Sequence, residues 1–292
     1  MPAIVPPGQA VDRGRVKHFG SATKPTSVRR TLVVLCFIGM TCIACGRTAN
    51  AAPFDEQGSR SVQGKDWSVR IGALGIHKPA YEGSDDYELR AFPLIDVTVG
   101  ETFFLHARTG AGVYIWNRND CKIGLAVGYT FGREEDDSSD LRGLGDIDDG
   151  ATANLLFEWA AGEVNLRARY EEQFTGHGTG FQVHLGLGHD LHVADKTILK
   201  SSIRTTYASS DYMEEYFGIS PGQSTRSGLP VYDAAGGFKS VGFHMMAIHR
   251  LDRHWGILAG AGYDRLVGDA GDSPVVKNEN QYGISIGVSY MF

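Results

Sequence analysis

The chain has 292 residues, of which 42% are apolar and 21% charged, and its formal net charge is −6. Its 38 glycines make up about 13% of the chain, against an average share of about 7%. Beyond residue 60 there is no helical repeat of two clean turns without glycine, and no apolar run reaches the roughly 18 to 20 residues of a membrane-spanning helix. These features argue against a helical bundle, an α/β fold and a helical membrane protein. They favour a large all-β chain.

An export signal is predicted near the N-terminus. Residues 31–45 form the most apolar stretch of the chain, between Arg29-Arg30 and the small-residue pattern Ala49-Asn50-Ala51. We therefore expect residues 1–51 to be a basic extension plus signal peptide, with Ala49 and Ala51 at the cleavage site. The removed part holds seven basic residues and one acidic residue, so the mature chain has a net charge of −12. An acidic exported protein is a poor nucleic-acid binder.

The C-terminal segment 281–292 alternates between two kinds of residue. Every even position is apolar or aromatic, and the positions between are mostly Gly, Ser or Gln. This period of two predicts a strand with one apolar face and one small, polar face. Aromatic residues at the ends of the apolar face, and the terminal phenylalanine, favour a strand of an outer-membrane barrel. Tyr290 and Phe292 are therefore predicted to be its C-terminal insertion signal.

The same alternation recurs along the chain from residue 67 to residue 292. It predicts an antiparallel transmembrane outer-membrane β-barrel of about twelve strands, preceded by a short periplasmic segment over 52–66. With twelve strands every long loop falls on the outer side, and a tight turn near Thr109 also falls there. If 102–116 were one long strand, the loop 133–149 would fall on the periplasmic side and break this pattern. Ten strands are the alternative count. The predicted strands lie near 67–77, 88–99, 102–108, 110–116, 121–132, 150–161, 163–174, 179–192, 197–207, 238–250, 255–266 and 280–292.

A charged row occupies alternate positions of the segment 163–171. Glu163, Arg167, Arg169 and Glu171 fall between the apolar positions of the same strand. Such a row cannot face lipid, but it can line a wet lumen. It predicts a polar interior, and it leaves a passive pore open as one function of the barrel.

Two loops and one group of side chains are candidate sites. The acidic segment 133–149 lacks the alternating ligand pattern of a calcium loop, so we expect a solvated face and no metal. Aromatic residues of the long segment 208–237 are expected either to contact a partner or to fold into the barrel mouth as a plug. His184 and His192 share lumen-facing parity near Ser201 and Ser202, but parity separates the two serines and no third orienting group is identifiable. We therefore expect neither catalysis nor a cofactor.

Several short segments together carry a resemblance to a known family. The first is Lys78-Pro79-Ala80-Tyr81-Glu82-Gly83-Ser84-Asp85-Asp86-Tyr87, and Leu141-Arg142-Gly143-Leu144-Gly145-Asp146 follows. Further along come Tyr216-Phe217-Gly218-Ile219, Ser227-Gly228-Leu229-Pro230-Val231-Tyr232 and Gly268-Asp269-Ala270-Gly271-Asp272-Ser273-Pro274. In this order, across residues 67 to 292, the sequence resembles the MipA/OmpV family, the MltA-interacting proteins of Gram-negative outer membranes.

The resemblance implies a location, a function and partners. It implies a scaffold in the outer membrane of a Gram-negative bacterium, which contacts membrane lipid and links a lytic murein transglycosylase to a peptidoglycan synthase. A second branch of the family implies a surface antigen or adhesin. On this basis we expect contacts with a partner from loop residues within the matching segments, and the sequence leaves the oligomeric state open. These residues are Tyr81, Glu82, Asp85, Asp86, Tyr216, Phe217 and Tyr232.

Overall fold

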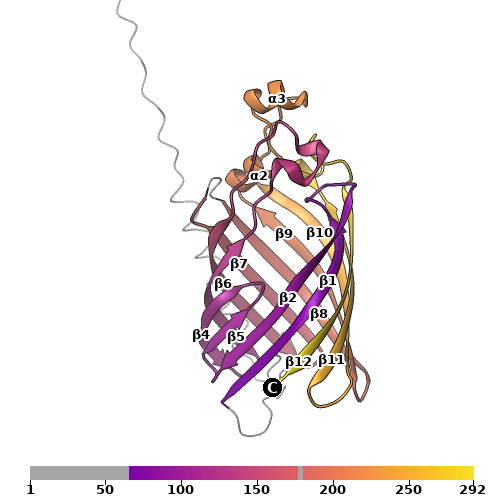
Figure 1. Ribbon diagram of the computed structural model, residues 1–292. Helices are drawn as coiled ribbons and strands as arrows, with labels where there is room; N and C mark the ends of the chain where they lie inside the picture. Colours follow the sequence, from indigo (N-terminus) through magenta and orange to yellow (C-terminus); the bar gives the residue numbers. More distant parts are fainter. Residues whose placement is uncertain (1–65, 177–179) are drawn as a thin grey trace, which may run out of the picture. The chain divides into compact units, whose positions relative to one another are not determined.

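The computed structural model describes residues 66–176 and 180–292, and these residues form a closed antiparallel β-barrel of twelve strands (Figure 1). Each strand is hydrogen-bonded to its neighbours in sequence order, and β1 closes the wall by pairing with β12. The predicted all-β barrel and its strand number are thereby confirmed. Pairing within a closed wall satisfies the backbone without water, which is what strands need in order to cross hydrocarbon. No helix in these two ranges is long and apolar enough to cross a membrane.

The strand bounds follow the predicted segments closely, and no strand end differs from its predicted position by more than two residues. The strands are β1 (Trp67–Pro79), β2 (Tyr87–Val99), β3 (Phe103–His106), β4 (Gly110–Arg118), β5 (Cys121–Thr130), β6 (Gly150–Ala161), β7 (Val164–Gln173), β8 (Phe181–Ala194), β9 (Thr197–Ala208), β10 (Gly237–Arg250), β11 (Trp255–Leu266) and β12 (Asn280–Met291).

The register keeps the two faces of the wall apart. Ile286 of β12 lies opposite Ala259 of β11 and Gly75 of β1, and cross-strand partners of this kind share a face. Ile286 is 67% exposed, as a lipid-facing residue should be in the isolated protein. The two serines of β12, Ser285 and Ser289, have the opposite parity and face the lumen.

The connections at the two ends of the barrel differ in length. Short turns over 100–102, 119–120, 162–163, 195–196 and 251–254 gather at one end, together with the C-terminus (Figure 1). The long segments 131–149, 209–236 and 267–279 lie at the other end. Because outer-membrane barrels carry short turns on the periplasmic side, the first end is periplasmic and the second extracellular.

Aromatic residues mark both ends of the apolar band. The four tryptophans all lie near periplasmic strand ends, where Trp255 packs edge-on against Tyr290 at 5.0 Å and Tyr290 against Phe292 at 4.8 Å. Tyrosine and phenylalanine residues, among them Tyr129 and Tyr282, lie near the extracellular ends of the strands. Such girdles sit at the two membrane interfaces, because an aromatic ring combines an apolar body with a polar or polarisable edge.

One predicted connection is wrong in its position. The sequence prediction placed the tight turn near Thr109 at the extracellular end, but residues 107–109 turn part-way up the wall. There Ala107 N–H donates to the Ile95 carbonyl at 2.9 Å, and the Thr109 carbonyl lies beside Gly128 of β5. The cause is the length of β3, whose four residues cover only about 14 Å, well short of a membrane-spanning strand.

Candidate functional site

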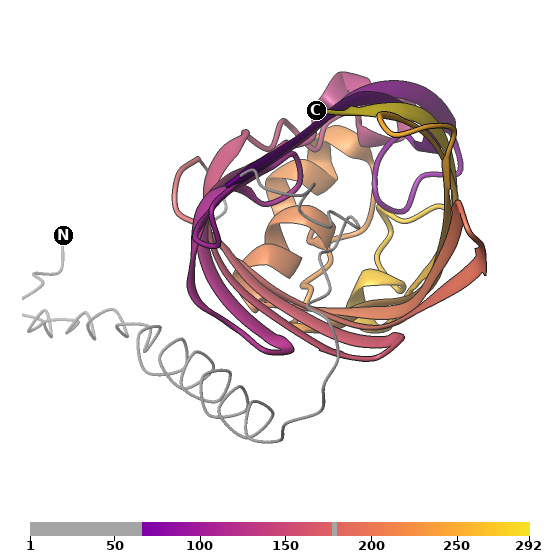
Figure 2. The same ribbon diagram turned by 90° about the horizontal axis from the view of Figure 1, so that it is seen from below.

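The extracellular mouth of the barrel is filled by a folded cap. We use this term for residues 80–86, 131–149, 209–236 and 267–279. The cap contains two α-helices and three 3-10 turns, and the helices cross the lumen when the barrel is seen from its periplasmic end (Figure 2). These elements are η1 (Glu135–Asp137), η2 (Ser139–Leu141), α2 (Ser210–Phe217), α3 (Pro221–Ser227) and η3 (Gly268–Ala270).

Helix α2 is started by a serine that also ties it to the wall. The Ser209 hydroxyl accepts hydrogen bonds from the backbone N–H of Tyr212 at 3.3 Å and from that of Phe181, on β8, at 3.0 Å. A serine at this position satisfies N–H groups that the first helical turn leaves without partners. Because residues four apart share one face of a helix, Met213 and Phe217 point together into the protein.

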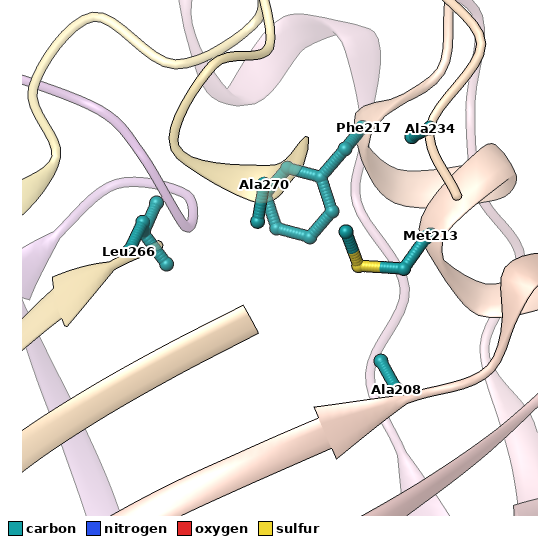
Figure 3. Close-up of a cluster of buried hydrophobic side chains, with 6 residues drawn as sticks. All are labelled: Ala208, Met213, Phe217, Ala234, Leu266 and Ala270. Carbon is teal, nitrogen blue, oxygen red and sulfur yellow. The ribbon is translucent and has the colours of Figure 1, made fainter. Parts of the chain in front are cut away.

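Met213 and Phe217 enter a buried apolar cluster between the cap and the tops of the strands (Figure 3). Both side chains are 1% exposed, and so is Leu266 at the end of β11. Burial of this completeness removes nearly all of their apolar surface from water, which stabilises the closed cap. The cluster consists of Ala208, Met213, Phe217, Ala234, Leu266 and Ala270.

A second apolar cluster joins all four segments of the cap. Tyr81 packs there with Leu141 and Ile219, and its hydroxyl donates to the Val275 carbonyl at 3.0 Å. Burial raises the pKa of Tyr81, and the nearby Asp140 carboxylate adds to that effect, so the hydroxyl stays a donor at neutral pH. Four segments that are distant in sequence therefore fold as one body.

A buried lysine connects this body to the wall. A bulge in β10 between Phe238 and Ser240 interrupts the alternation, and Lys239 is only 5% exposed. Its Nζ lies 2.9 and 2.8 Å from the two carboxylate oxygens of Glu82, and 3.2 Å from the Tyr212 hydroxyl. A buried ammonium group is stable only with such partners, so this contact fixes the cap on β10.

Arg133 is a second buried cation of the cap. It is 8% exposed, and its Nη1 donates to the Tyr216 carbonyl at 2.9 Å. Burial is the main cause that lowers the pKa of Arg133, and burial likewise raises the pKa of Tyr212 and Tyr216. These tyrosines are accordingly neutral, and Tyr212 and Tyr216 stack on each other at 4.3 Å between ring centroids.

Several carboxylates of the acidic segment 133–149 accept hydrogen bonds from backbone N–H groups of the same segment. The backbone N–H of Glu135 donates to Asp146 at 2.7 Å, and that of Gly145 donates to Glu135 at 2.9 Å. Asp149 accepts from the Tyr129 hydroxyl at 2.6 Å and from the Gly132 N–H at 2.7 Å, and these two bonds lower the pKa of the Asp149 carboxyl. The carboxylates are thus partly used to hold the loop in shape.

One group of carboxylates comes close enough to hold a metal ion. Oxygens of Asp85, Asp86 and Asp140 lie within 4.8 Å of one another. Asp85 and Asp86 are exposed, and exposed acidic groups are common without an ion. The three carboxylates form an acidic corner of the cap.

The structure distributes the predicted contact residues between interior and surface. Tyr81 and Phe217 are buried at 6% and 1% exposure, whereas Asp85 and Asp86 are exposed. Glu82 is held by Lys239, and the Tyr232 hydroxyl donates to the Asp269 carbonyl at 2.9 Å. The aromatic members therefore pack the cap, which is the plug arrangement considered from the sequence. Their contact with a partner stays a prediction.

Three residues of the predicted charged row lie on one strand, and the fourth lies in the turn before it. Arg167, Arg169 and Glu171 have lumen parity on β7, and Arg169 bonds directly to Glu171 and lies 3.4 Å from Asn154. Glu163 instead lies in the periplasmic turn after β6, 3.3 Å from His189. The polar wall of the lumen thus extends over β6 and β7, and Glu163 belongs to its periplasmic rim.

A serine–histidine pair does not form at the lumen-facing His184. Its Nδ1 lies 3.1 Å from the Thr206 hydroxyl, while Ser202 lies four residues away along β9 and accepts from Arg204 at 3.0 Å. Four residues of a strand span about 13 Å, beyond hydrogen-bond reach. Ser201 has the opposite parity to Ser202, as the sequence predicted.

Sequence reasoning missed the buried charges. Besides Lys239 and Arg133, Asp96 of β2 is 4% exposed and lies 3.2 Å from His106 Nε2 and 3.8 Å from Arg70 Nη1. For Asp96 the signal was a charged residue at lumen parity inside an apolar strand, whereas Arg133 lies in a loop and a bulge shifts the parity at Lys239. The predicted cleavage residues Ala49 and Ala51 lie outside the described residues.

Comparison with known proteins identifies the family. The family described as MltA-interacting protein MipA matches residues 71–292, which is the barrel from β1 to the C-terminus. The chain belongs to the MipA family. It is a protein of the Gram-negative outer membrane, where its apolar outer face contacts lipid.

Relatives in this family share low identity over most of their length. Outer membrane protein OmpV of Vibrio cholerae is 26% identical over 58% of this chain and 63% of its own. Outer membrane protein Omp26La of Vibrio anguillarum is 24% identical over 88% and 98%. The MltA-interacting protein of Escherichia coli K12 is 23% identical over 80% and 94%. These relatives confirm the family and the location that the sequence resemblance implied.

Proposed function

We propose that this MipA-family barrel is a non-enzymatic scaffold that holds a murein hydrolase, and with it a peptidoglycan synthase, at the inner face of the outer membrane. The name of the Escherichia coli relative, MltA-interacting protein, supports a murein enzyme as partner. The observation that carries the proposal is the packed cap, because a barrel whose outer mouth is filled by a buried core is suited to anchoring and not to diffusion.

The periplasmic rim is the surface that a murein enzyme would meet. It carries exposed charges of both signs in short turns, including Arg118, Glu163 and Arg253. Short turns on a closed wall are rigid, and rigid charged surfaces favour fast and specific association. We infer that the partner binds here. We also infer that residues 1–51 are removed on export, and that residues 52–66 then precede the barrel on this side.

A pull-down with matched variants tests the scaffold. The mature chain in lipid nanodiscs should retain a purified lytic murein transglycosylase. Arg118→Glu with Arg253→Glu, at the periplasmic rim, should reduce retention severalfold. Glu134→Lys with Asp136→Lys, in the exposed acidic segment of the cap, should leave it unchanged. Equal retention by all three proteins, or none by the unmodified chain, would refute binding at the rim.

A surface adhesin or antigen is the second candidate, and the exposed acidic segment of the cap is what favours it. In that case the cap variants, and not the rim variants, should change binding to host or neighbouring cells. A passive pore is the third candidate, and the filled mouth counts against it. A lipid hydrolase requires a nucleophile beside His184, and His184→Ala should therefore leave phospholipid unhydrolysed to the same extent as the unmodified chain.

A further inference from the structure

The barrel wall is incomplete in its extracellular half, between β2 and β5. β2 pairs with β3 only from Asp96 to Val99, and the last backbone bond on that side reaches Ile95. Among the described residues, nothing pairs with this edge of β2 from Tyr87 to Leu94. On the far side, the pairing of β5 with β4 ends at Val127. The turn over 107–109, which joins β3 to β4, is therefore the lower border of an opening, and Figure 1 shows this hairpin turning well below the top of β2.

The free edge of β2 has the marks of an edge strand. In an antiparallel ladder the backbone N–H and C=O of one residue point to the same neighbouring strand. The backbone groups of Ile95 and Val97 point toward β3, so those of the other odd-numbered residues of β2 point toward the opening, while their side chains face lipid. Pro93 is one of them and has no N–H to leave unsatisfied, which is why proline is tolerated at such an edge. The remaining polar groups would be costly in hydrocarbon, so the edge needs a polar surrounding or a partner.

Apolar side chains lie on both the lipid face and the lumen face of the wall beside this opening. Outside, Leu89 and Ile95 are 75% and 40% exposed on the lipid face of β2. Inside, Phe92 and Leu94 have lumen parity on the same strand. Below the turn, the lumen side holds a buried apolar cluster of Phe104, Tyr114, Ala126 and Leu156. The lumen side of the wall is thus apolar at this level.

An arginine side chain lies at the lower border of the opening. Arg108 lies in the 107–109 turn, is exposed, and has no hydrogen bond or ion pair with any described residue. Two other cations on the inner side of the wall, Arg169 and Lys239, have carboxylate partners. Arg169 is bonded to Glu171 and Lys239 to Glu82, so Arg108 differs from them in lacking a carboxylate.

One ion pair bridges the opening from above. Arg90 Nη2 of β2 lies 3.1 Å from Asp137 Oδ1 of η1, in the segment that follows β5. The contact is partly exposed, and ion pairs of this kind are weak enough to open and close. Loss of this contact frees Asp137 from β2, while Leu141 and Leu144 of the same segment stay in the second buried cluster of the cap.

We propose that the gap between β2 and β5 is a lateral entrance through which a single-chain anionic amphiphile, of the fatty-acid class, passes from the outer leaflet into the lumen. The acyl chain lies against Phe92, Leu94 and the apolar cluster below the turn. The carboxylate pairs with Arg108, and the Arg90–Asp137 contact closes the entrance above it. The membrane is the source of the ligand, because the opening faces lipid and the cap fills the aqueous mouth.

Tryptophan quenching by brominated lipids tests the entrance in the mature chain refolded in phosphatidylcholine vesicles. Phe92→Trp places a reporter on the lumen face, and Ala91→Trp places one on the lipid face of the same strand. Brominated phosphatidylcholine should quench the second and spare the first. Brominated dodecanoate should quench both, and the quenching at position 92 should saturate. Leu94→Trp replaces the lumen reporter if the Phe92 variant does not fold.

The charge and the closing contact are tested in the same background. Arg108→Ala should raise the half-saturating concentration of dodecanoate about tenfold, the expected effect of losing one charge-assisted contact. Arg142→Ala, at an exposed arginine of the cap, should leave it unchanged, and Asp137→Asn should speed the quenching. The proposal is overturned if dodecanoate does not quench the lumen reporter above the unmodified chain, or if Arg108→Ala has no effect. The pull-down of a murein enzyme is independent of either result.

Discussion

Lys239 is the residue on which the attachment of the cap to the wall depends most directly. Its ammonium group is 5% exposed and is neutralised by Glu82, whose own side chain is about one-third exposed. Glu82→Gln should leave a buried charge without its counter-charge and lower the free energy of unfolding by about 2 kcal/mol. The measurement is urea denaturation, with proteolysis of residues 209–236 as a local readout.

The double variant Lys239→Met with Glu82→Gln is the control for this prediction. Because it removes both charges, it should recover most of the lost stability. If the single and double variants were equally unstable, the ion pair would not be the cause. Sequence patterns could not reveal this contact. The alternation of a strand predicts which face each side chain lies on, and the bulge at Lys239 interrupts that alternation.

The facing of single residues along the regular strands, in contrast, follows from the period of two. Ile286→Arg, at mid-strand on the lipid face, should lower stability in bilayers by roughly 2 to 4 kcal/mol. Ser285→Arg, one residue away on the lumen face, should cost less than about 1 kcal/mol, because the guanidinium reaches the lumen. Equilibrium unfolding in vesicles compares the two, and equal losses would contradict the assignment of faces.

At the level of elements, α2 holds the cap through Phe217. Phe217→Ala should lower the stability of the cap by about 3 kcal/mol, because the side chain is fully enclosed and leaves a cavity. Val231→Ala, at a 51% exposed position of the same segment, should change it by less than about 0.5 kcal/mol. Hydrogen exchange of residues 209–236 measures both. Similar protection in the two variants would show that the buried cluster does not hold α2.

The strands were predictable, and the helices of the cap were not. Six of the twelve strands, β5 to β8, β11 and β12, show clear alternation, so their positions follow from sequence. The helices α2 and α3 have eight and seven residues, too few for a period of 3.6 to stand out. Their signal was in the caps, Ser209 before α2 and the Ser220–Gln223 capping box of α3. β3 was predicted too long because its end falls inside the wall and carries no change in composition.

Across the whole molecule, the glycine excess reflects close approach inside a narrow, closed wall. A Cβ at Gly112 would lie 2.4 Å from the Leu125 carbonyl, and one at Gly242 would lie 2.0 Å from the Asp264 carboxylate. Both positions face the lumen, where neighbouring strands of a curved sheet converge. Composition therefore predicted the fold class correctly. The buried contacts that close the mouth depend on which loops meet, and no local pattern carries that information.

The closed extracellular mouth distinguishes a scaffold from a pore, because a pore needs an open lumen. Single-channel recording of the mature chain in planar bilayers tests it most directly. We predict no ion-conducting steps from the unmodified protein, since α2 and the two buried clusters fill the lumen at its extracellular end. Stable, reproducible steps from the unmodified protein would contradict the account.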